Sequence, residues 1–226
     1  MIDKFKDNVH EAVADIPDGA TVLVGGFGGA GHPTELLHAL LEQGARDLTM
    51  VSNNAGNHEV GLAALIKAER VRKMICSFPR ASHSYVFNQF YAEGRIELEC
   101  VPQGTIAERL HAAGAGLGGF YTRTGYGTEL AAGKEVREID GHGYVFERPL
   151  HADYALVLAE KGDRWGNLTY NKTARNFGPV MCQAAKTTIV QVKQKVALGE
   201  LDPEVIVTPG IFVQRVVVVS NPQFSS

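Results

Sequence analysis

The architecture of this chain is decided by one stretch, Thr21-Val22-Leu23-Val24-Gly25-Gly26-Phe27-Gly28-Gly29-Ala30-Gly31-His32-Pro33. Residues 21–24 form a mostly apolar run, which is typical of a strand buried on both faces. Pro33 suits the start of a helix, and Gly44 suits its end. Leu36, Leu37, Leu40 and Leu41 give that helix one apolar face. A buried strand, a glycine loop and a helix in succession favour a parallel α/β sheet.

The same alternation recurs along the chain. Further strands are predicted at 48–51, 72–76 and 96–101, and helices at 3–15, 59–68, 83–93 and 105–113. After residue 120, strands are predicted at 143–147, 154–159, 187–192 and 212–219, with longer loops between them. The sequence therefore predicts an α/β fold, a mostly parallel sheet with helices on both faces and a mixed α/β second half. We expect a single domain over residues 1–226, with a frayed end at 221–226.

Composition excludes several classes of protein. The 226 residues include 22 Lys and Arg against 25 Asp and Glu, and no basic stripe indicates nucleic-acid binding. No apolar run approaches the ~20 residues that span a membrane. The first residues lack the apolar region of a secretory signal, so we expect a cytoplasmic protein. Cys76, Cys100 and Cys182 are far apart, so reduced, buried thiols are expected and no metal site.

Residues 25–31 allow a ligand to approach the backbone closely and present N–H groups to an anion. Gly26, Gly28 and Gly31 satisfy the dinucleotide pattern G-x-G-x-x-G. That pattern also expects an acidic residue about 20 positions later. Asn53 and Asn54 stand there instead, which argues against NAD. A nucleotide- or sugar-phosphate-binding module and a purely structural turn remain open alternatives.

Residues 18–33 resemble the N-terminal signature of the family I CoA-transferases. That signature runs Asp-Gly, an apolar strand, Gly-Gly-Phe and then Gly-x-Pro, and every element is present. Further matching segments are 51–56, 101–105, 124–128, 166–170 and 174–177. The resemblance extends from about residue 15 to 219 and is to the A (alpha) subunits of the 3-oxoacid type.

The resemblance implies an enzyme that moves CoA from succinyl-CoA to a 3-oxo acid. In this family the nucleophile is a glutamate in a Ser-Glu-Asn-Gly motif on the B (beta) subunit. The present chain contains no Ser-Glu pair. The family thus implies a heterodimer with a B subunit, CoA and succinyl-CoA as substrates, and no permanently bound cofactor. A noncatalytic assembly partner is the remaining alternative.

The resemblance also assigns residues to the site. It implies that the backbone of Gln103 stabilises the oxyanion of the reacting thioester. Asn53 and Asn54 would line the same pocket, although an Asx turn would explain them equally well. The CoA contact would come from the glycine loop, namely Gly25, Gly26, Phe27, Gly28, Gly29, Ala30 and Gly31.

We expect the segment Cys76-Ser77-Phe78-Pro79-Arg80 to influence substrate choice. Family members that act on 3-oxoadipate, in aromatic-compound degradation (the β-ketoadipate pathway), carry a similar Ser-Phe-Pro-Arg, whereas those acting on acetoacetate usually differ. A diacid needs a cation for its second carboxylate, and we expect Arg80 to supply it. A surface arginine is the alternative. Finally, the run Val216–Val219 predicts an apolar face that the partner would cover.

Overall fold

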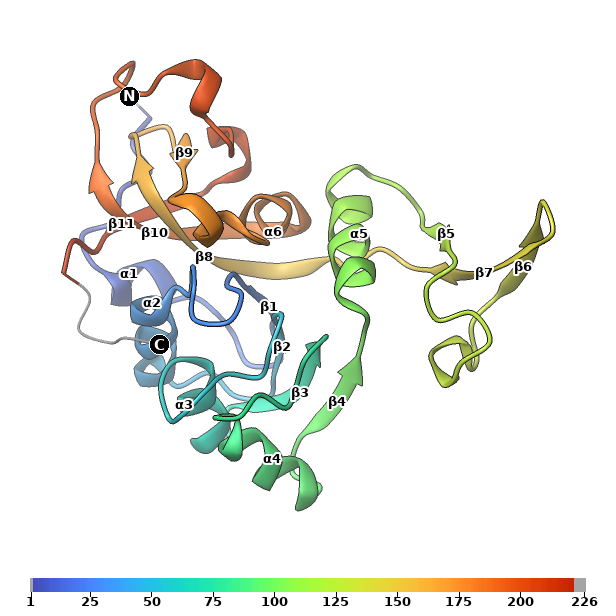
Figure 1. Cartoon of the computed structure of the whole chain (residues 1–226). Helices are drawn as coiled ribbons and strands as arrows, with labels where there is room; N and C mark the ends of the chain where they lie inside the picture. Colours follow the sequence, from blue (N-terminus) through green and yellow to red (C-terminus); the bar gives the residue numbers. More distant parts are fainter. Residues whose placement is uncertain (1, 222–226) are drawn as a thin grey trace.

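The computed structural model describes residues 2–221 (Figure 1), so most of the expected frayed end lies outside the described residues. Its centre is an eight-stranded sheet with the order β11-β10-β8-β1-β2-β3-β4, to which β9 is added beside β8. The strands are β1 (Thr21–Val24), β2 (Leu48–Val51), β3 (Val71–Cys76), β4 (Glu97–Cys100), β8 (Ala152–Gly162), β9 (Leu168–Thr169), β10 (Ala185–Lys195) and β11 (Arg215–Val218). Neighbours pair in parallel, except that β9 is antiparallel to β8.

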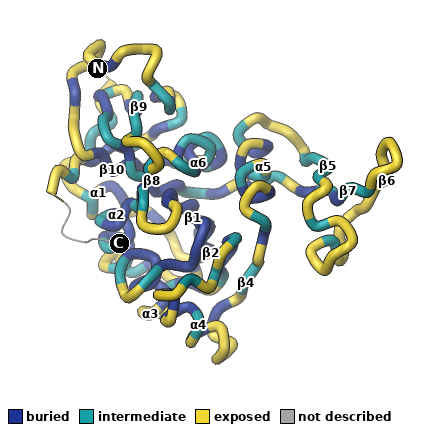
Figure 2. Tube along the Cα trace, in the orientation of Figure 1, coloured by how far each residue is buried: buried dark blue, intermediate teal, exposed yellow. Residues whose placement is uncertain are grey.

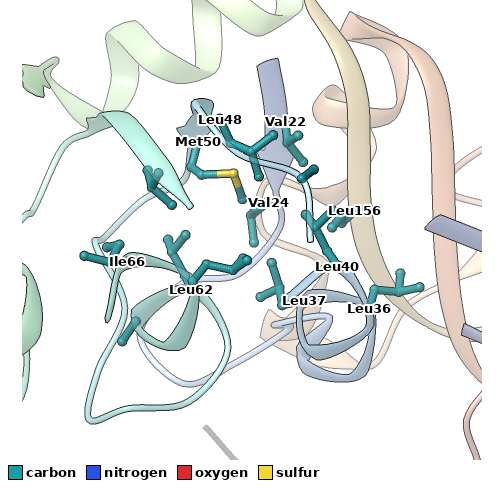
Figure 3. Packing of buried hydrophobic residues seen from close by; sticks show 14 of the residues in the cluster. Val22, Val24, Leu36, Leu37, Leu40, Leu48, Met50, Leu62, Ile66 and Leu156 are labelled. Carbon is teal, nitrogen blue, oxygen red and sulfur yellow. The ribbon is translucent and has the colours of Figure 1, made fainter. Parts of the chain in front are cut away.

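Helices cover both faces of the sheet, as predicted. One face carries α1 (Val9–Val13), α2 (Thr34–Gln43), α3 (Leu62–Lys67) and α4 (Tyr85–Ala92), and the other carries α5 (Gln103–Gly114) and α6 (Gly178–Ala184). Val22 and Val24 of β1 pack into the first layer, against leucines of α2 (Figure 3), whereas Leu23 packs into the second. Because side chains alternate along a strand, three apolar residues in succession contribute to two cores.

The second half of the chain contributes strands to two sheets. Its long strands β8, β10 and β11 continue the parallel sheet, since β8 lies directly beside β1. A separate antiparallel sheet contains β5 (Phe120–Thr122), β7 (His142–Glu147) and β6 (Val136–Ile139), in that order. It projects from the body in Figure 1, and we call residues 117–148 the arm. Short 3₁₀ turns complete the chain at Glu129–Ala131, Lys172–Arg175 (η2), Pro203–Val205 and Gly210–Phe212.

The helix predicted at 3–15 is wrong at its start. Residues 4–6 are extended and pair with Val216 of β11 through the Lys6 N–H to Val216 O and Val216 N–H to Lys4 O hydrogen bonds, each 2.8 Å. The helix begins only at Val9, because the Asn8 side chain caps it by accepting from the Glu11 N–H at 2.9 Å. The apolar spacing of Phe5 and Val9 reflects a strand followed by a helix, not one helix.

That short pairing also corrects the expectation of an exposed apolar run at 216–219. Val216 and Val217 are buried within the chain, because the N-terminal segment and the two core layers enclose them. Within the run, Val218 is exposed. Val216 and Val217 therefore need no partner to cover them.

The cysteines are all free thiols, and two of the three are buried as expected. Burial raises the pKa of Cys76 and of Cys182 to about 12. Cys100 is exposed at the end of β4. In residues 2–221 we find no group of three or more His, Cys, Asp or Glu side chains that could hold a metal ion. No helix in that same range is long and apolar enough to cross a membrane.

Candidate active site at the carboxyl edge of the sheet

The predicted site segments follow four adjacent parallel strands. Leu23, Val51, Ile75 and Glu99 lie in register across β1, β2, β3 and β4, so these strands end together. The glycine loop follows β1, Asn53 and Asn54 follow β2, Arg80 follows β3, and Gln103 follows β4. Strands in a sheet are about 4.8 Å apart, which puts the first and last of these segments roughly 15 Å from each other. The fold therefore brings them to one edge as an elongated site.

The glycine loop is a tight hairpin. The Phe27 and Ala30 backbones exchange hydrogen bonds of 2.9 and 3.0 Å, so Gly28 and Gly29 form an exposed tip. Gly28 has a φ of +61°, in the left-handed region that glycine tolerates best. A Cβ built on Gly28 would meet nothing within 4 Å, so the tip is open to a ligand.

The His32 side chain supports this hairpin through a hydrogen bond and close packing. Its Nε2 lies 2.8 Å from Gly28 O, and its ring packs so closely that a Cβ on Gly26 would be 2.6 Å away. Burial lowers the pKa of His32, although the contact with the Gly28 carbonyl opposes that shift. The imidazole is therefore neutral near pH 7, with the Nε2–H donating to Gly28 O.

Asn53 and Asn54 are both buried, but they differ in bonding. Asn53 joins the loops after β2 and β3, because its carbonyl accepts from the Ser77 and Phe78 N–H groups and its Oδ1 accepts from Ser77 Oγ at 3.0 Å. Asn54 Oδ1 has no hydrogen-bond partner among the described residues. Asn54 also lines a cavity of about 20 Å³ beside Gly28. Asn53 therefore joins two loops, whereas the Asn54 Oδ1 can accept a hydrogen bond from a ligand.

Arg80 and Gln103 are exposed at the same edge. The Arg80 guanidinium lies 5.9 Å from the Tyr91 ring centroid and forms no ion pair within residues 2–221. Gln103 is the first residue of α5, with Pro102 as the N-cap. First-turn N–H groups have no intrahelical acceptor and carry the positive end of the helix dipole. Both residues are therefore available to negatively charged groups.

Sequence reasoning missed a second wall of the site. A groove of about 560 Å³ is lined by Phe27, Ala30 and residues of the η2 segment, Lys172, Thr173, Arg175 and Asn176. Neither Lys172 nor Arg175 has an acidic partner in the described chain, so the groove suits an anionic ligand. The match at 174–177 was a signal for this segment, but no local pattern indicates that it lies beside the glycine loop.

Comparison with known proteins identifies the family. The profile of the family described as Coenzyme A transferase matches residues 6–219. The chain belongs to the Coenzyme A transferase family. The A subunit of 3-oxoadipate CoA-transferase from Pseudomonas putida is 65% identical over 226 residues, which are 100% of this chain and 98% of that relative. The A subunit of a probable succinyl-CoA:3-ketoacid coenzyme A transferase from Bacillus subtilis (strain 168) is 47% identical over 214 residues, 95% of this chain and 89% of the relative.

The fold of this Coenzyme A transferase chain also matches solved structures. An acyl-CoA transferase from E. coli O157:H7, crystallised as a thioester complex with CoA, superposes with a TM-score of 0.88 at 24% identity. The match covers 98% of this chain and 50% of that one, so the present chain spans half the length of that enzyme. At this identity the likeness concerns the fold, and it confirms the predicted architecture.

Proposed function

We propose that this chain is the A subunit of a heteromeric cytoplasmic CoA-transferase that moves CoA from succinyl-CoA to 3-oxoadipate in aromatic-compound degradation. The observation that carries the proposal is the 65% identity, over the entire chain, to a protein named as the A subunit of a 3-oxoadipate CoA-transferase. The absence of a Ser-Glu pair supports a division of labour in which the B subunit brings the nucleophile.

The CoA transfer consists of two half-reactions of the same kind. The partner's glutamate carboxylate attacks the thioester carbonyl of succinyl-CoA, and departure of the CoA thiolate gives a mixed anhydride. The thiolate then attacks the glutamyl carbonyl, which releases succinate and leaves a glutamyl-CoA thioester. The carboxylate of 3-oxoadipate then attacks the glutamyl-CoA thioester, which releases the CoA thiolate and forms a second anhydride. The thiolate attacks the 3-oxoadipyl carbonyl of that anhydride, which frees the glutamate carboxylate and gives the CoA thioester of 3-oxoadipate. No resident cofactor is needed, because every bond made or broken belongs to the substrates or to that glutamate.

This chain would then form one wall of the site. Each attack places negative charge on a carbonyl oxygen, and the Gln103 N–H at the start of α5 is suited to receive it. The open Gly28–Gly29 tip and the Asn54 side-chain carbonyl oxygen would border the acyl-CoA. Arg80 would bind the distal carboxylate of the diacid, since it lacks an acidic partner of its own within residues 2–221.

Reconstitution tests the proposal. The purified chain alone should not turn over, whereas the chain mixed with a B subunit should transfer CoA from succinyl-CoA to 3-oxoadipate. Borohydride should inactivate the complex only after succinyl-CoA is added, because the glutamyl-CoA thioester is reducible, and peptide mass spectrometry should locate the reduced glutamate in the partner. Steady turnover by this chain alone, with no partner detectable by mass spectrometry, would contradict the proposal.

A second candidate acceptor is acetoacetate, favoured by the 47% identical relative whose name specifies 3-ketoacids. The same reconstituted complex, assayed with both acids, separates the two. A higher kcat/KM for acetoacetate than for 3-oxoadipate would assign the chain to the 3-ketoacid enzymes. Thermal-shift measurements with succinyl-CoA and with NADH test the dinucleotide alternative, and stabilisation by NADH alone would revive it.

A further inference from the structure

One side chain joins the glycine loop to a segment about 150 residues away in the sequence. Asn176 Oδ1 accepts from the Gly26 N–H at 3.0 Å, and Asn176 Nδ2 donates to Ala30 O at 3.0 Å. The same amide also holds its own segment, because Oδ1 accepts from the Phe177 N–H at 2.7 Å and Nδ2 donates to Thr173 O at 3.0 Å. A side-chain amide has two donors and two acceptor lone pairs, and all four are used here.

The backbone around this amide is strained and closely packed. Asn176 has φ +22° and ψ −115°, a conformation that persists only where the surroundings enforce it. On the other side of the contact, a Cβ on Gly31 would lie 2.5 Å from Ala174 O. Gly31 is therefore needed for the two segments to approach, and the bonds of Asn176 fix their separation.

The contact lies at a topologically special place. β1 and β8 are parallel neighbours, but the chain continues from β1 toward β2 on one side and from β8 toward β10 on the other. Ligands of open α/β sheets bind outside the carboxyl ends of the strands at such a reversal. The loop after β1 and the η2 segment, which follows β8 and β9, therefore meet where a ligand is expected.

We propose that Asn176 is a positioning residue that holds the Phe27–Ala30 hairpin in the shape required by the acyl-CoA. Its side chain forms hydrogen bonds to both sides of the hairpin, at Gly26 and Ala30, and leaves the Gly28–Gly29 tip exposed. It acts through the loop and contacts no reacting atom. The inference rests on the proposed function, in which that loop borders the CoA substrate.

The first test compares Asn176→Ala with Asn171→Ala in the complex with the B subunit. Asn171 is an exposed asparagine of the same segment, and its side chain makes no capping hydrogen bond. Asn176→Ala should lower kcat/KM for succinyl-CoA by about 10- to 100-fold, because a misplaced contact of about 1 Å has effects of that size. The kcat/KM for 3-oxoadipate should fall less than about threefold, since CoA is already covalently held when the acid enters. Asn171→Ala should match the wild type.

The second test uses Asn176→Asp, which adds a titratable group to the same position. The carboxylate keeps the acceptor for Gly26 and Phe177 but turns an oxygen toward the carbonyls of Thr173 and Ala30. Protonation restores one donor there. The rate of this variant with succinyl-CoA, divided by the wild-type rate, should therefore rise at least about fivefold from pH 8 to pH 6. The same ratio for Asn176→Ala should stay flat.

Amide hydrogen exchange of the peptide containing residues 25–31 separates this inference from the proposed function. Exchange should be at least about tenfold faster in Asn176→Ala than in wild type and Asn171→Ala. A wild-type complex without transferase activity overturns the proposed function and, with it, the role toward CoA. An active wild type overturns the inference alone if Asn176→Ala retains its kcat/KM for succinyl-CoA, or if the Asn176→Asp ratio is independent of pH.

Discussion

The glycine loop and the arm use the same residue type for opposite purposes. In the loop, glycine allows backbone to meet backbone, as where a Cβ on Gly31 would lie 2.5 Å from Ala174 O. In the arm, glycine makes room for rings, since a Cβ on Gly143 would lie 2.0 Å from the Tyr126 ring. The loop is anchored to a distant segment, whereas the arm is mostly exposed (Figure 2), and every residue of β6 is exposed.

The difference indicates which property each region controls. The carboxyl edge is preorganised by hydrogen bonds that cross between strand ends, so a change there should alter catalysis before stability. At its base the arm is held to the body by a polar contact, the hydrogen bond that Arg109 Nε of α5 donates to Arg148 O at 2.9 Å. Truncation of exposed side chains in the arm should leave the isolated chain's stability nearly unaltered, whereas a side chain added to a glycine of positive φ there should still introduce backbone strain.

The largest effect is expected from Gly28→Val, with Gly127→Val on the arm as its matched control. Both glycines have positive φ, +61° and +74°, and a Cβ at either one meets nothing within 4 Å. Each valine should therefore cost a similar strain of about 1–2 kcal/mol in the folded state. Only Gly28→Val should abolish transfer of CoA while the complex with the B subunit still assembles. Equal activities in the two variants would place the loop outside the site.

A second comparison concerns stability and uses two leucines. Leu156 of β8 is fully buried, whereas Leu130 on the arm is 38% exposed. Leu156→Ala should lower the free energy of unfolding by about 3 kcal/mol, because it leaves a cavity in the core. Leu130→Ala should change it by less than about 0.5 kcal/mol. Urea denaturation of the isolated chain measures both, and a large loss at Leu130 would mean that the arm is part of the cooperative core.

A third comparison is between Arg80, at the carboxyl edge of the sheet, and an arginine of the arm. Arg80→Ala should lower kcat/KM for 3-oxoadipate by about 10- to 100-fold, since a hydrogen bond to a charged group contributes roughly 1.5–3 kcal/mol. Acetoacetate, which has no second carboxylate, should be affected little. Arg148, an exposed arginine of the arm, provides the control substitution Arg148→Ala. Equal losses of kcat/KM with both acids would mean that Arg80 supports the fold and does not bind the second carboxylate of the diacid.

The bounds of β1 and β2 could be predicted from their mostly apolar runs, because strands buried on both faces leave such runs in the sequence. Those of β3 and β4 were predicted within about a residue, although both strands carry charged side chains. The arm was harder, since β5 and β6 are short and partly or wholly exposed and carry little alternation. The start of the first helix was misjudged because Phe5 and Val9 have helical spacing. The Asn8 cap with Glu11 three residues later was the stronger signal.

The candidate site was predictable only in part. Local motifs place the glycine loop, Asn53, Asn54, Arg80 and Gln103 after strands, and parallel order then brings them to one edge. Nothing local connects Gly26 with Asn176, because that contact depends on β8 inserting beside β1. Nor does the sequence distinguish Asn53, whose Oδ1 accepts from Ser77 Oγ, from Asn54, whose Oδ1 has no partner in the described chain.

The smallest expected effect is a pH dependence that His32 gives to the glycine loop. Because burial lowers the pKa of His32, the unfolded chain binds a proton at this residue near its ordinary pKa of 6.5, and the folded chain binds it only at lower pH. Stability must then fall as the pH drops below about 6.5. His32→Gln keeps a donor for Gly28 O but cannot titrate, so its Tm should fall less than the wild-type Tm between pH 7.5 and 5.5. The exposed His142 of the arm serves as the control, and His142→Gln should follow the wild-type curve. Parallel curves for all three proteins would mean that the hairpin accommodates a charged imidazole, and the rigid support that distinguishes the loop from the arm would then have to come from Asn176 alone.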